Sequence, residues 1–265
     1  MTQFTDIAVT KSGYVATIEI RRPPHNFFDM PLIKQIATAF EEMDQDAGIR
    51  ALVLCAEGKS FCAGANFGDG SKLDAQGNRP DENTRANPGH LYQEAVRLFR
   101  TRKPVVGAIQ GAAIGGGLGL ALVPDFRVTC PEGRFAANFT RLGFHPGFGL
   151  THTLPALIGP QQAHLMFYTG RRLSGEEAVK IGLADVLVPL ADVRNAALSL
   201  AADIAESAPL AVMETRATVR AGLADRVKAA TDHELKIQSE LRKTDDFKEG
   251  VKSVAERRVA NFKGR

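Results

Sequence analysis

The sequence contains no tryptophan, only three tyrosines and only three cysteines among its 265 residues. Cys55, Cys62 and Cys130 lack CxxC or metal-ligand spacing, so we expect free, buried thiols in a reducing compartment. No apolar run approaches the ~18 residues of a membrane-spanning helix, and the N-terminus has no apolar targeting core. These absences predict a cytoplasmic protein that does not associate with membranes.

A concentration of charge is also lacking. Lys and Arg number 33 and Asp and Glu number 30, which gives a net charge of +3, and the two signs are interspersed. This pattern does not support nucleic-acid binding. The basic excess gathers in residues 257–265, where a small anionic ligand or a neighbouring subunit can meet it. The six histidines show no HExxH-like spacing, so we expect no metal site.

The hydrophobic pattern is that of an ordinary globular chain, with 44% hydrophobic and 24% charged residues. Strands alternate with helices up to Gly159, and the later pattern is mostly helical. This order predicts an α/β core followed by a helical C-terminal region. The expected strands are 14–20, 51–55, 104–109 and 126–129, and the expected helices are 31–43, 91–99, 118–122, 160–168, 174–181, 191–206, 209–221, 224–242 and 246–259.

Two segments rich in glycine and alanine follow buried strands. They are residues 60–66 (SFCAGAN) and 111–119 (GAAIGGGLG). Open α/β folds bind ligands at the carboxyl ends of parallel strands, and small residues let a ligand approach backbone N–H groups. The second segment leads into a helix N-terminus, which favours negative charge. Two converging N–H groups make an oxyanion hole; a phosphate loop is the alternative, although neither GxxxxGK[ST] nor GxGxxG is present.

In these and other segments the sequence resembles the crotonase, or enoyl-CoA hydratase/isomerase, superfamily. The resemblance covers essentially the whole chain, in the same order and spacing. It implies a spiral of ββα units over residues 1–200 that carries the acyl-CoA site, and a helical region over 201–265 that assembles trimers, which often pair into hexamers. The matching segments are 60–66, 104–123, 125–130, 141–149, 169–185 and 247–265.

The resemblance also implies roles for individual residues. The backbone N–H groups of Ala65 and Gly116 correspond to the oxyanion donors. Ala63 and its neighbours correspond to the path of the adenine and pantetheine. Arg257 falls where many members have a basic residue near the coenzyme A phosphates, in some cases those of a neighbouring subunit. Coenzyme A enters as part of the thioester substrate, and no prosthetic group is implied.

Two glutamates that add water in hydratases of this superfamily are missing. Gly119 and Phe139 stand at the corresponding positions, and neither can transfer a proton. Histidine is a common general acid or base near neutral pH, so His145, in the turn 143–149, is the candidate acid–base group; a histidine that hydrogen-bonds the turn backbone is the alternative. Phe139 and Phe148 are expected to line an apolar acyl pocket or to belong to the core.

Other polar side chains near these positions have weaker chemistry or simpler alternatives. Asn138 can polarise a water but cannot accept a proton, and Asn66 is expected to tie one loop to the other. Arg141 can pair with a substrate carboxylate or form an internal salt bridge. The polar stretch 66–89 can swing carboxylates over the site or leave them solvated; the candidates in or beside it are Asp69, Asp74, Glu82 and His90.

The sequence therefore predicts an acyl-CoA-processing enzyme, nominally a lyase that hydrates 2-enoyl-CoA through an oxyanion-stabilised enolate. Isomerisation, decarboxylation, thioester hydrolysis and carbon–carbon cleavage pass through the same or a related oxyanion. They remain open because both usual glutamates are absent. A non-catalytic acyl-CoA-binding protein or assembly subunit is the alternative from a different class.

Overall fold

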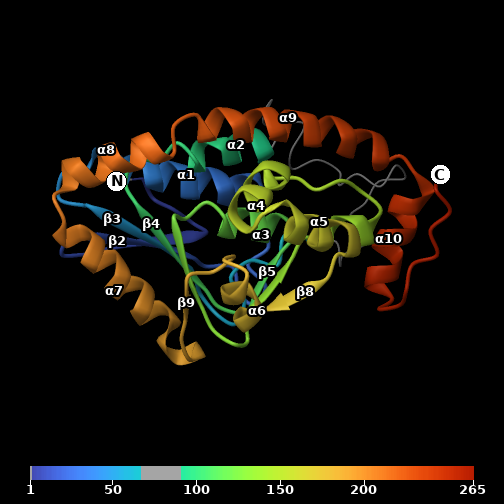
Figure 1. Ribbon diagram of the computed structural model, residues 1–265, viewed down its shortest axis with the longest axis horizontal. Helices are drawn as coiled ribbons and strands as arrows, with labels where there is room; N and C mark the ends of the chain where they lie inside the picture. The colour runs from blue at the N-terminus through green and yellow to red at the C-terminus, as the bar shows by residue number, and fades with distance from the viewer. Residues whose placement is uncertain (1, 67–90) are drawn as a thin grey trace.

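The structure of the chain is a computed structural model, which describes residues 2–66 and 91–265 (Figure 1). Within these residues, one sheet has six strands in the order β1-β2-β3-β4-β6-β9. β1 pairs antiparallel with β2, and the other neighbours are parallel. The strands are β1 (Ile7–Ser12), β2 (Val15–Ile20), β3 (Ala51–Ala56), β4 (Val105–Ile109), β6 (Phe126–Thr129) and β9 (Val186–Leu187).

A second sheet and the helices surround the first. The second sheet has the order β5-β7-β8 and consists of β5 (Ala112–Ile114), β7 (Arg134–Ala136) and β8 (Arg172–Ser174). The helices in the described residues are α1 (Met30–Gln45), α2 (Leu91–Leu98), α3 (Gly116–Ala121), α4 (Leu150–Ile158), α5 (Pro160–Thr169), α6 (Gly175–Lys180), α7 (Val193–Glu206), α8 (Pro209–Val219), α9 (Leu223–Leu241) and α10 (Asp245–Ala255).

β3 lies inside the large sheet because its side chains are apolar on both faces. Leu52 and Leu54 belong to a core shared with α1 and α2. Val53 and Cys55 belong to the opposite core, which α7 completes with its alanines. All residues of β3 are buried, which confirms the continuous apolar strand expected over 51–55.

α1 begins where its sequence supplies a cap. The Asp29 side chain accepts a hydrogen bond from Leu32 N at 3.0 Å, and Pro31 occupies the first turn, where its missing N–H costs nothing. Apolar residues at helical spacing, including Ile36 and Phe40, then face the sheet. The cap fixes the direction of the segment before α1, which is part of the site described below.

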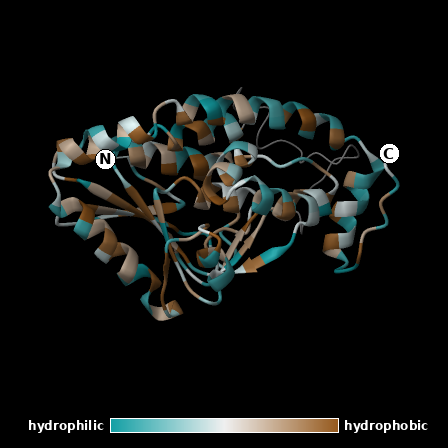
Figure 2. Ribbon diagram, in the orientation of Figure 1, coloured by the Kyte–Doolittle hydropathy of each residue, from teal (hydrophilic) through white to brown (hydrophobic). Residues whose placement is uncertain are grey.

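The C-terminal helices fold back over the core. α9 runs past α2 and α4 along the upper edge of the molecule, and α10 packs against the 3-10 helix Asn138–Leu142 (Figure 1). The large sheet is mainly hydrophobic, whereas α9 mixes hydrophilic and hydrophobic residues (Figure 2). The division expected at residue 200 falls inside α7, whose buried face continues to Ala205, and the two-part organisation stays a prediction.

The predicted helices are present, and their ends differ by a few residues. The helix expected over 118–122 begins earlier, at Gly116, because Gly115 with φ 57° turns the chain directly from β5 into α3. β1, β9, the small sheet and α4 were not predicted. In residues 2–66 and 91–265 no single helix is long and apolar enough to cross a membrane; only Leu190–Glu206 with Pro209–Val219, bent by 106°, pass that test as a pair.

Candidate active site

The two glycine- and alanine-rich segments lie side by side. Cys62 N donates a hydrogen bond to Ala112 O at 2.8 Å, and Ile114 N donates to Cys62 O at 3.1 Å. These bonds form a parallel bridge between Cys62 and Ala113 at the edge of the small sheet. The backbone after Cys62 therefore runs beside the chain that enters α3.

Glycines permit this approach because a side chain would not fit. A Cβ placed on Gly64, whose φ is +82°, would lie 2.6 Å from Ile114 O and 3.8 Å from Gly116 N. A Cβ on Gly117 would lie 2.1 Å from Cys62 O. Neither Ala65 N–H nor Gly116 N–H donates to an acceptor among the residues that the structure describes. Two unused backbone donors thus flank the junction of the two loops.

A buried asparagine that the sequence did not single out stabilises the first loop. Asn26 has no exposed surface and a φ of +49°. Its Oδ1 accepts from Arg22 N at 2.9 Å, and its Nδ2 donates to Glu57 O at 2.8 Å and Ser60 O at 2.7 Å. It joins the turn after β2 to the segment after β3, so one side chain aligns both. A turn-forming Asn after two prolines was the available signal.

The turn around Asn26 binds the first loop directly. Ala63 N donates to His25 O at 3.0 Å, and Phe28 N donates to Gly64 O at 3.1 Å. The half-buried Ala63, expected beside the coenzyme A path, therefore has its own N–H occupied. The N–H of Ala65, two residues on, donates to no acceptor within residues 2–66 and 91–265 and can bind an external one.

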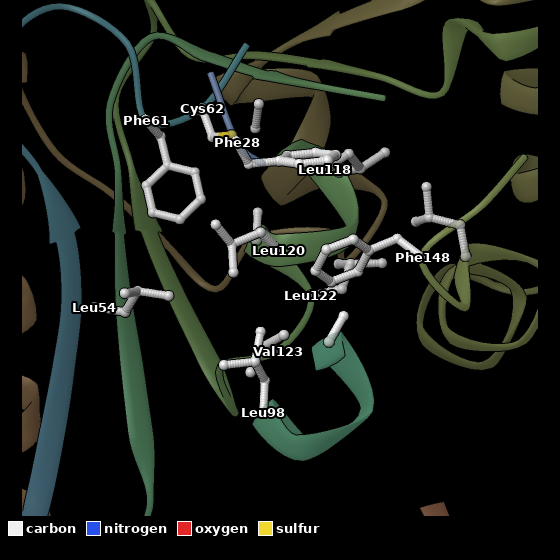
Figure 3. Packing of buried hydrophobic residues seen from close by; sticks show 14 of the residues in the cluster. Phe28, Leu54, Phe61, Cys62, Leu98, Leu118, Leu120, Leu122, Val123 and Phe148 are labelled. Carbon is white, nitrogen blue, oxygen red and sulfur yellow. The ribbon is translucent and has the colours of Figure 1, made fainter. Parts of the chain in front are cut away.

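Aromatic rings cover the other side of α3 (Figure 3). A Cβ on Gly116 would lie 2.2 Å from Phe28 Cζ, and a Cβ on Gly119 would lie 2.7 Å from Phe148 Cβ. The ring centroids of Phe28 and Phe148 are 5.8 Å apart, and those of Tyr92 and Phe148 are 6.1 Å apart. Phe148 has an unusual φ of +66°, which directs its side chain onto α3.

The two positions that lack the usual glutamates are buried and apolar. Gly119 packs against Phe148. Phe139 is 4% exposed, and its ring meets that of Phe144 edge-on at 5.4 Å. Next to it, Asn138 Oδ1 lies 3.4 Å from a Cβ placed on Gly115. The structure therefore contains aromatic packing at both positions rather than a proton-transfer group.

His145 is half-buried in the predicted turn. Its Nδ1 is 2.8 Å from Pro146 O, and its ring centroid is 6.1 Å from that of His233 on α9. Its backbone oxygen accepts from Gln238 Nε2 at 2.7 Å. The hydrogen bond to the turn backbone was the alternative weighed for this residue, and its acid–base role stays a prediction.

The remaining predicted residues are spread over the molecule. Arg257 follows α10, which lies well apart from α3 in Figure 1, so a contact with coenzyme A in a neighbouring subunit stays a prediction. Arg141 Nε donates to the backbone oxygen of Thr169 at 2.6 Å, which is an internal hydrogen bond and not the salt bridge expected as its alternative. Asn66 has interactions within the structure. Four polar candidates lie outside the described residues: Asp69, Asp74, Glu82 and His90.

Other chemistry has little support in the part of the chain that the structure describes. Burial raises the pKa of the Cys62 thiol to about 12, so it is not a thiolate near neutral pH. No group of three His, Cys, Asp or Glu residues in the described ranges can hold a metal ion. A cavity of about 590 Å³ opens on the α7 side between Lys59, Arg134 and Arg194, but neither Ala65 nor Gly116 lines it.

A family model described as enoyl-CoA hydratase/isomerase matches residues 10–265, almost the whole chain. The chain belongs to the enoyl-CoA hydratase/isomerase family. A probable enoyl-CoA hydratase of Bacillus subtilis (strain 168) is 30% identical over 259 residues, 97% of this chain and 98% of that protein. The crotonyl-CoA hydratase of Syntrophomonas wolfei subsp. wolfei is 31% identical over 262 residues, 98% of each protein.

Solved structures of the family share the fold. The crystal structure of an enoyl-CoA hydratase/isomerase from Pseudoalteromonas atlantica T6c matches with a TM-score of 0.86 and 26% identity, and it covers 98% of this chain and 100% of its own. An enoyl-CoA hydratase from Mycobacterium avium subsp. paratuberculosis K-10 matches with a TM-score of 0.83 and 26% identity, over 98% of this chain and 100% of its own. The crotonase fold predicted from the sequence is confirmed.

Proposed function

We propose that this family member binds an acyl-CoA thioester and stabilises its thioester oxygen as an enolate-like oxyanion between Ala65 N–H and Gly116 N–H. The junction of the two loops carries the proposal, because glycines bring them together and both donors lack an acceptor among the described residues. Preorganised donors of this kind contribute roughly 3–4 kcal/mol each to transition-state stabilisation. Coenzyme A enters with the substrate, along Ala63 and towards Arg257 of the same or a neighbouring subunit.

The nominal reaction is hydration of a trans-2-enoyl-CoA by a cytoplasmic homotrimer or dimer of trimers. Water adds at the β carbon, the electrons of the double bond move onto the thioester oxygen, and a proton is then delivered to the α carbon. The hydratase names of relatives at about 30% identity support this reaction. His145, a carboxylate from the stretch 66–89 or an ordered water supplies the proton transfer that Gly119 and Phe139 cannot.

A second candidate is decarboxylation of a malonyl-type thioester, which the apolar surroundings of Gly119 and Phe139 favour. Cleavage of the bond to the carboxylate releases CO2 and leaves its electron pair in the enolate, which water then protonates. No protein base is needed to form that enolate. Isomerisation, thioester hydrolysis and carbon–carbon cleavage use the same two donors, and a binding protein without turnover uses only the binding step.

Assays of the purified protein separate these candidates. Crotonyl-CoA and longer enoyl-CoAs test hydration by the loss of the conjugated thioester absorbance, and a malonyl-type thioester tests decarboxylation by CO2 release. We expect slow hydration relative to glutamate-bearing hydratases, by about 10²–10⁴-fold, since acid–base help of that size is missing. Decarboxylation without hydration selects the second candidate, and tight thioester binding without any turnover rejects catalysis.

The oxyanion donors are tested by Gly116→Val in a background that accommodates the side chain. Because a Cβ at position 116 meets the Phe28 ring, Phe28→Ala serves as the matched control and Phe28→Ala/Gly116→Val as the test. We expect the second variant to lose at least about 10²-fold in kcat/KM relative to the first, with the same far-ultraviolet circular dichroism. Equal kcat/KM in the two variants removes Gly116 from the site.

A further inference from the structure

Three buried polar side chains share one face of α9. Thr231, Glu234 and Gln238 are 2%, 0% and 1% exposed, and their spacing places them on successive turns of the same stripe. Polar groups are buried at this depth only where hydrogen bonds satisfy them. The partners of two of these side chains lie in the turn after Gly143, which carries Phe148.

Glu234 caps α4 from a distant part of the chain. Its Oε2 accepts from Gly149 N at 2.7 Å, and its Oε1 accepts from Thr151 N at 2.9 Å and Thr151 Oγ1 at 2.6 Å. The N-cap residue of α4 is Gly149, which has no side chain to do this. Burial raises the pKa of Glu234, and these hydrogen bonds oppose that shift. The N–H and hydroxyl groups of the turn and α4 therefore stabilise the buried carboxylate, and the carboxylate in return caps α4.

Gln238 holds the other end of the same turn. Its Nε2 donates to His145 O at 2.7 Å and lies 3.3 Å from Tyr92 Oη. Tyr92 is 5% exposed, and its ring meets Phe148 edge-on. One side chain of α9 therefore connects the start of the turn to an aromatic residue that packs on Phe148.

Phe148 lies between these two anchors in a conformation that needs support. A bulky residue with φ +66° persists only where its surroundings hold it. Its Cβ and Cγ would both lie 2.7 Å from a Cβ at position 119, and its ring is 1% exposed. The turn thus presses Phe148 onto α3, one helical turn from Gly116.

We propose that Glu234 and Gln238 are positioning residues of the acyl-CoA site, which hold Phe148 against Gly119 as a fixed wall beside the oxyanion donors. This role rests on the proposed function. Phe148 fills the space that a side chain at position 119 would occupy, and it limits the length of the acyl group on that side. Release of either anchor frees Phe148 to move and opens the site towards longer acyl chains.

A double-mutant cycle on folding stability tests the clamp without any ligand. The added methyl group in Gly119→Ala forces Phe148 outward. This substitution should therefore destabilise the wild-type protein more than it destabilises the Glu234→Gln variant, in which the turn can change its conformation. We expect a coupling of at least about fivefold in the folding equilibrium constant between position 119 on α3 and position 234 on α9. Thr231→Val is the control, because its hydroxyl bonds Val227 O within α9 and the valine, which has the same shape, keeps the packing of this position beside Gly149. Additive effects at 119 and 234 overturn the clamp.

Calorimetric titration with butyryl-CoA and octanoyl-CoA tests the effect on the site. Glu234→Gln and Gln238→Leu should raise the affinity for octanoyl-CoA relative to butyryl-CoA at least about fivefold, while Thr231→Val keeps the wild-type ratio. An unchanged ratio in both anchor variants, or loss of the fold in both, makes these residues merely structural and overturns the proposal. If the wild type binds neither thioester, the proposed function fails, whereas the stability cycle still decides whether Glu234 holds Phe148.

Discussion

Asn26 shows how much a single buried amide does for the first loop. Its fully buried side chain makes three hydrogen bonds to backbone groups of Arg22, Glu57 and Ser60. We predict that Asn26→Ala lowers the free energy of unfolding by about 3 kcal/mol, since each of the three hydrogen bonds contributes roughly 1 kcal/mol. Urea denaturation followed by circular dichroism measures this.

Asn26→Gly separates the lost bonds from the backbone conformation. Asn26 has φ +49°, which glycine adopts freely and alanine does not. The glycine variant should therefore unfold at a free energy about 1 kcal/mol higher than the alanine variant. Equal stabilities of the two variants would show that the turn changes its conformation once the amide is gone.

Some site residues can be predicted from the sequence around them, whereas others act through contacts with distant parts of the chain. The loops that contain Ala65 and Gly116 are visible in the sequence because small residues after a buried strand already indicate a close backbone approach, and the family resemblance points to these two residues within them. Phe28 was not predicted, and Phe148 was expected only to line an acyl pocket or to belong to the core, since each packs on a glycine far along the chain: Phe148 on Gly119, and Phe28 on Gly116. The sequence alone shows that positions 119 and 139 carry no glutamate. Only the structure shows that Phe148 packs on Gly119 and that the ring of Phe144 meets that of Phe139.

At the scale of elements, an ion-pair cluster ties β1 to the start of α1. Arg22 bonds Asp6 Oδ2 and Asp29 Oδ2, both at 2.7 Å, and Asp29 caps α1. The Arg22 hydrogen bond and charge hold the pKa of Asp6 below its ordinary value. The turn that positions Phe28 and Asn26 begins at Arg22, so this cluster supports the site.

Because the pKa of Asp6 is lowered in the folded protein, its contribution to the free energy of unfolding depends on pH in a direction that can be predicted. A carboxyl group whose pKa is lowered on folding stabilises the protein above its unfolded pKa of about 4, and this contribution is lost as the pH falls through the folded value. The difference in unfolding free energy between wild type and Asp6→Asn should be constant from about pH 6 to pH 8 and shrink below about pH 4. Denaturation curves at several pH values measure it.

The same comparison in an Arg22→Leu background is the control, because the main partner of Asp6 is then gone. In that background the change in unfolding free energy caused by Asp6→Asn should lose its pH dependence. A pH-dependent difference of the original size would assign the effect to Gln35, whose Nε2 also donates to Asp6 at 2.7 Å.

Element prediction succeeded where one segment carries its own periodic signal. β3 is apolar throughout and α1 has a cap and an apolar stripe, so both follow from local sequence. β1 is largely exposed beyond Ile7 and needs β2 as its partner. α4 contains Pro155 and takes its cap from Glu234, 85 positions after Gly149, so no local pattern marks its start.

In the molecule as a whole, the C-terminal helices pack over the candidate site, whose residues come from the first two-thirds of the chain. α9 supplies the anchors of the turn that bears Phe148, and α10 packs on the 3-10 helix that contains Phe139. The region 201–265 therefore contributes to the site of its own chain, in addition to the assembly role expected for it. Three apolar side chains near its end are exposed, namely Val254 (47%), Val259 (91%) and Phe262 (41%).

We predict that these exposed apolar side chains near the end of the chain take part in self-association. Analytical ultracentrifugation should give a particle of three or six 28.5 kDa chains, and Val259→Asp/Phe262→Asp should lower the mass by placing two charges in an apolar contact. Tyr168→Asp is the matched control, since Tyr168 is 73% exposed on α5, outside the region assigned to assembly. A monomeric wild type, or dissociation by the Tyr168 variant alone, would move the interface away from residues 201–265.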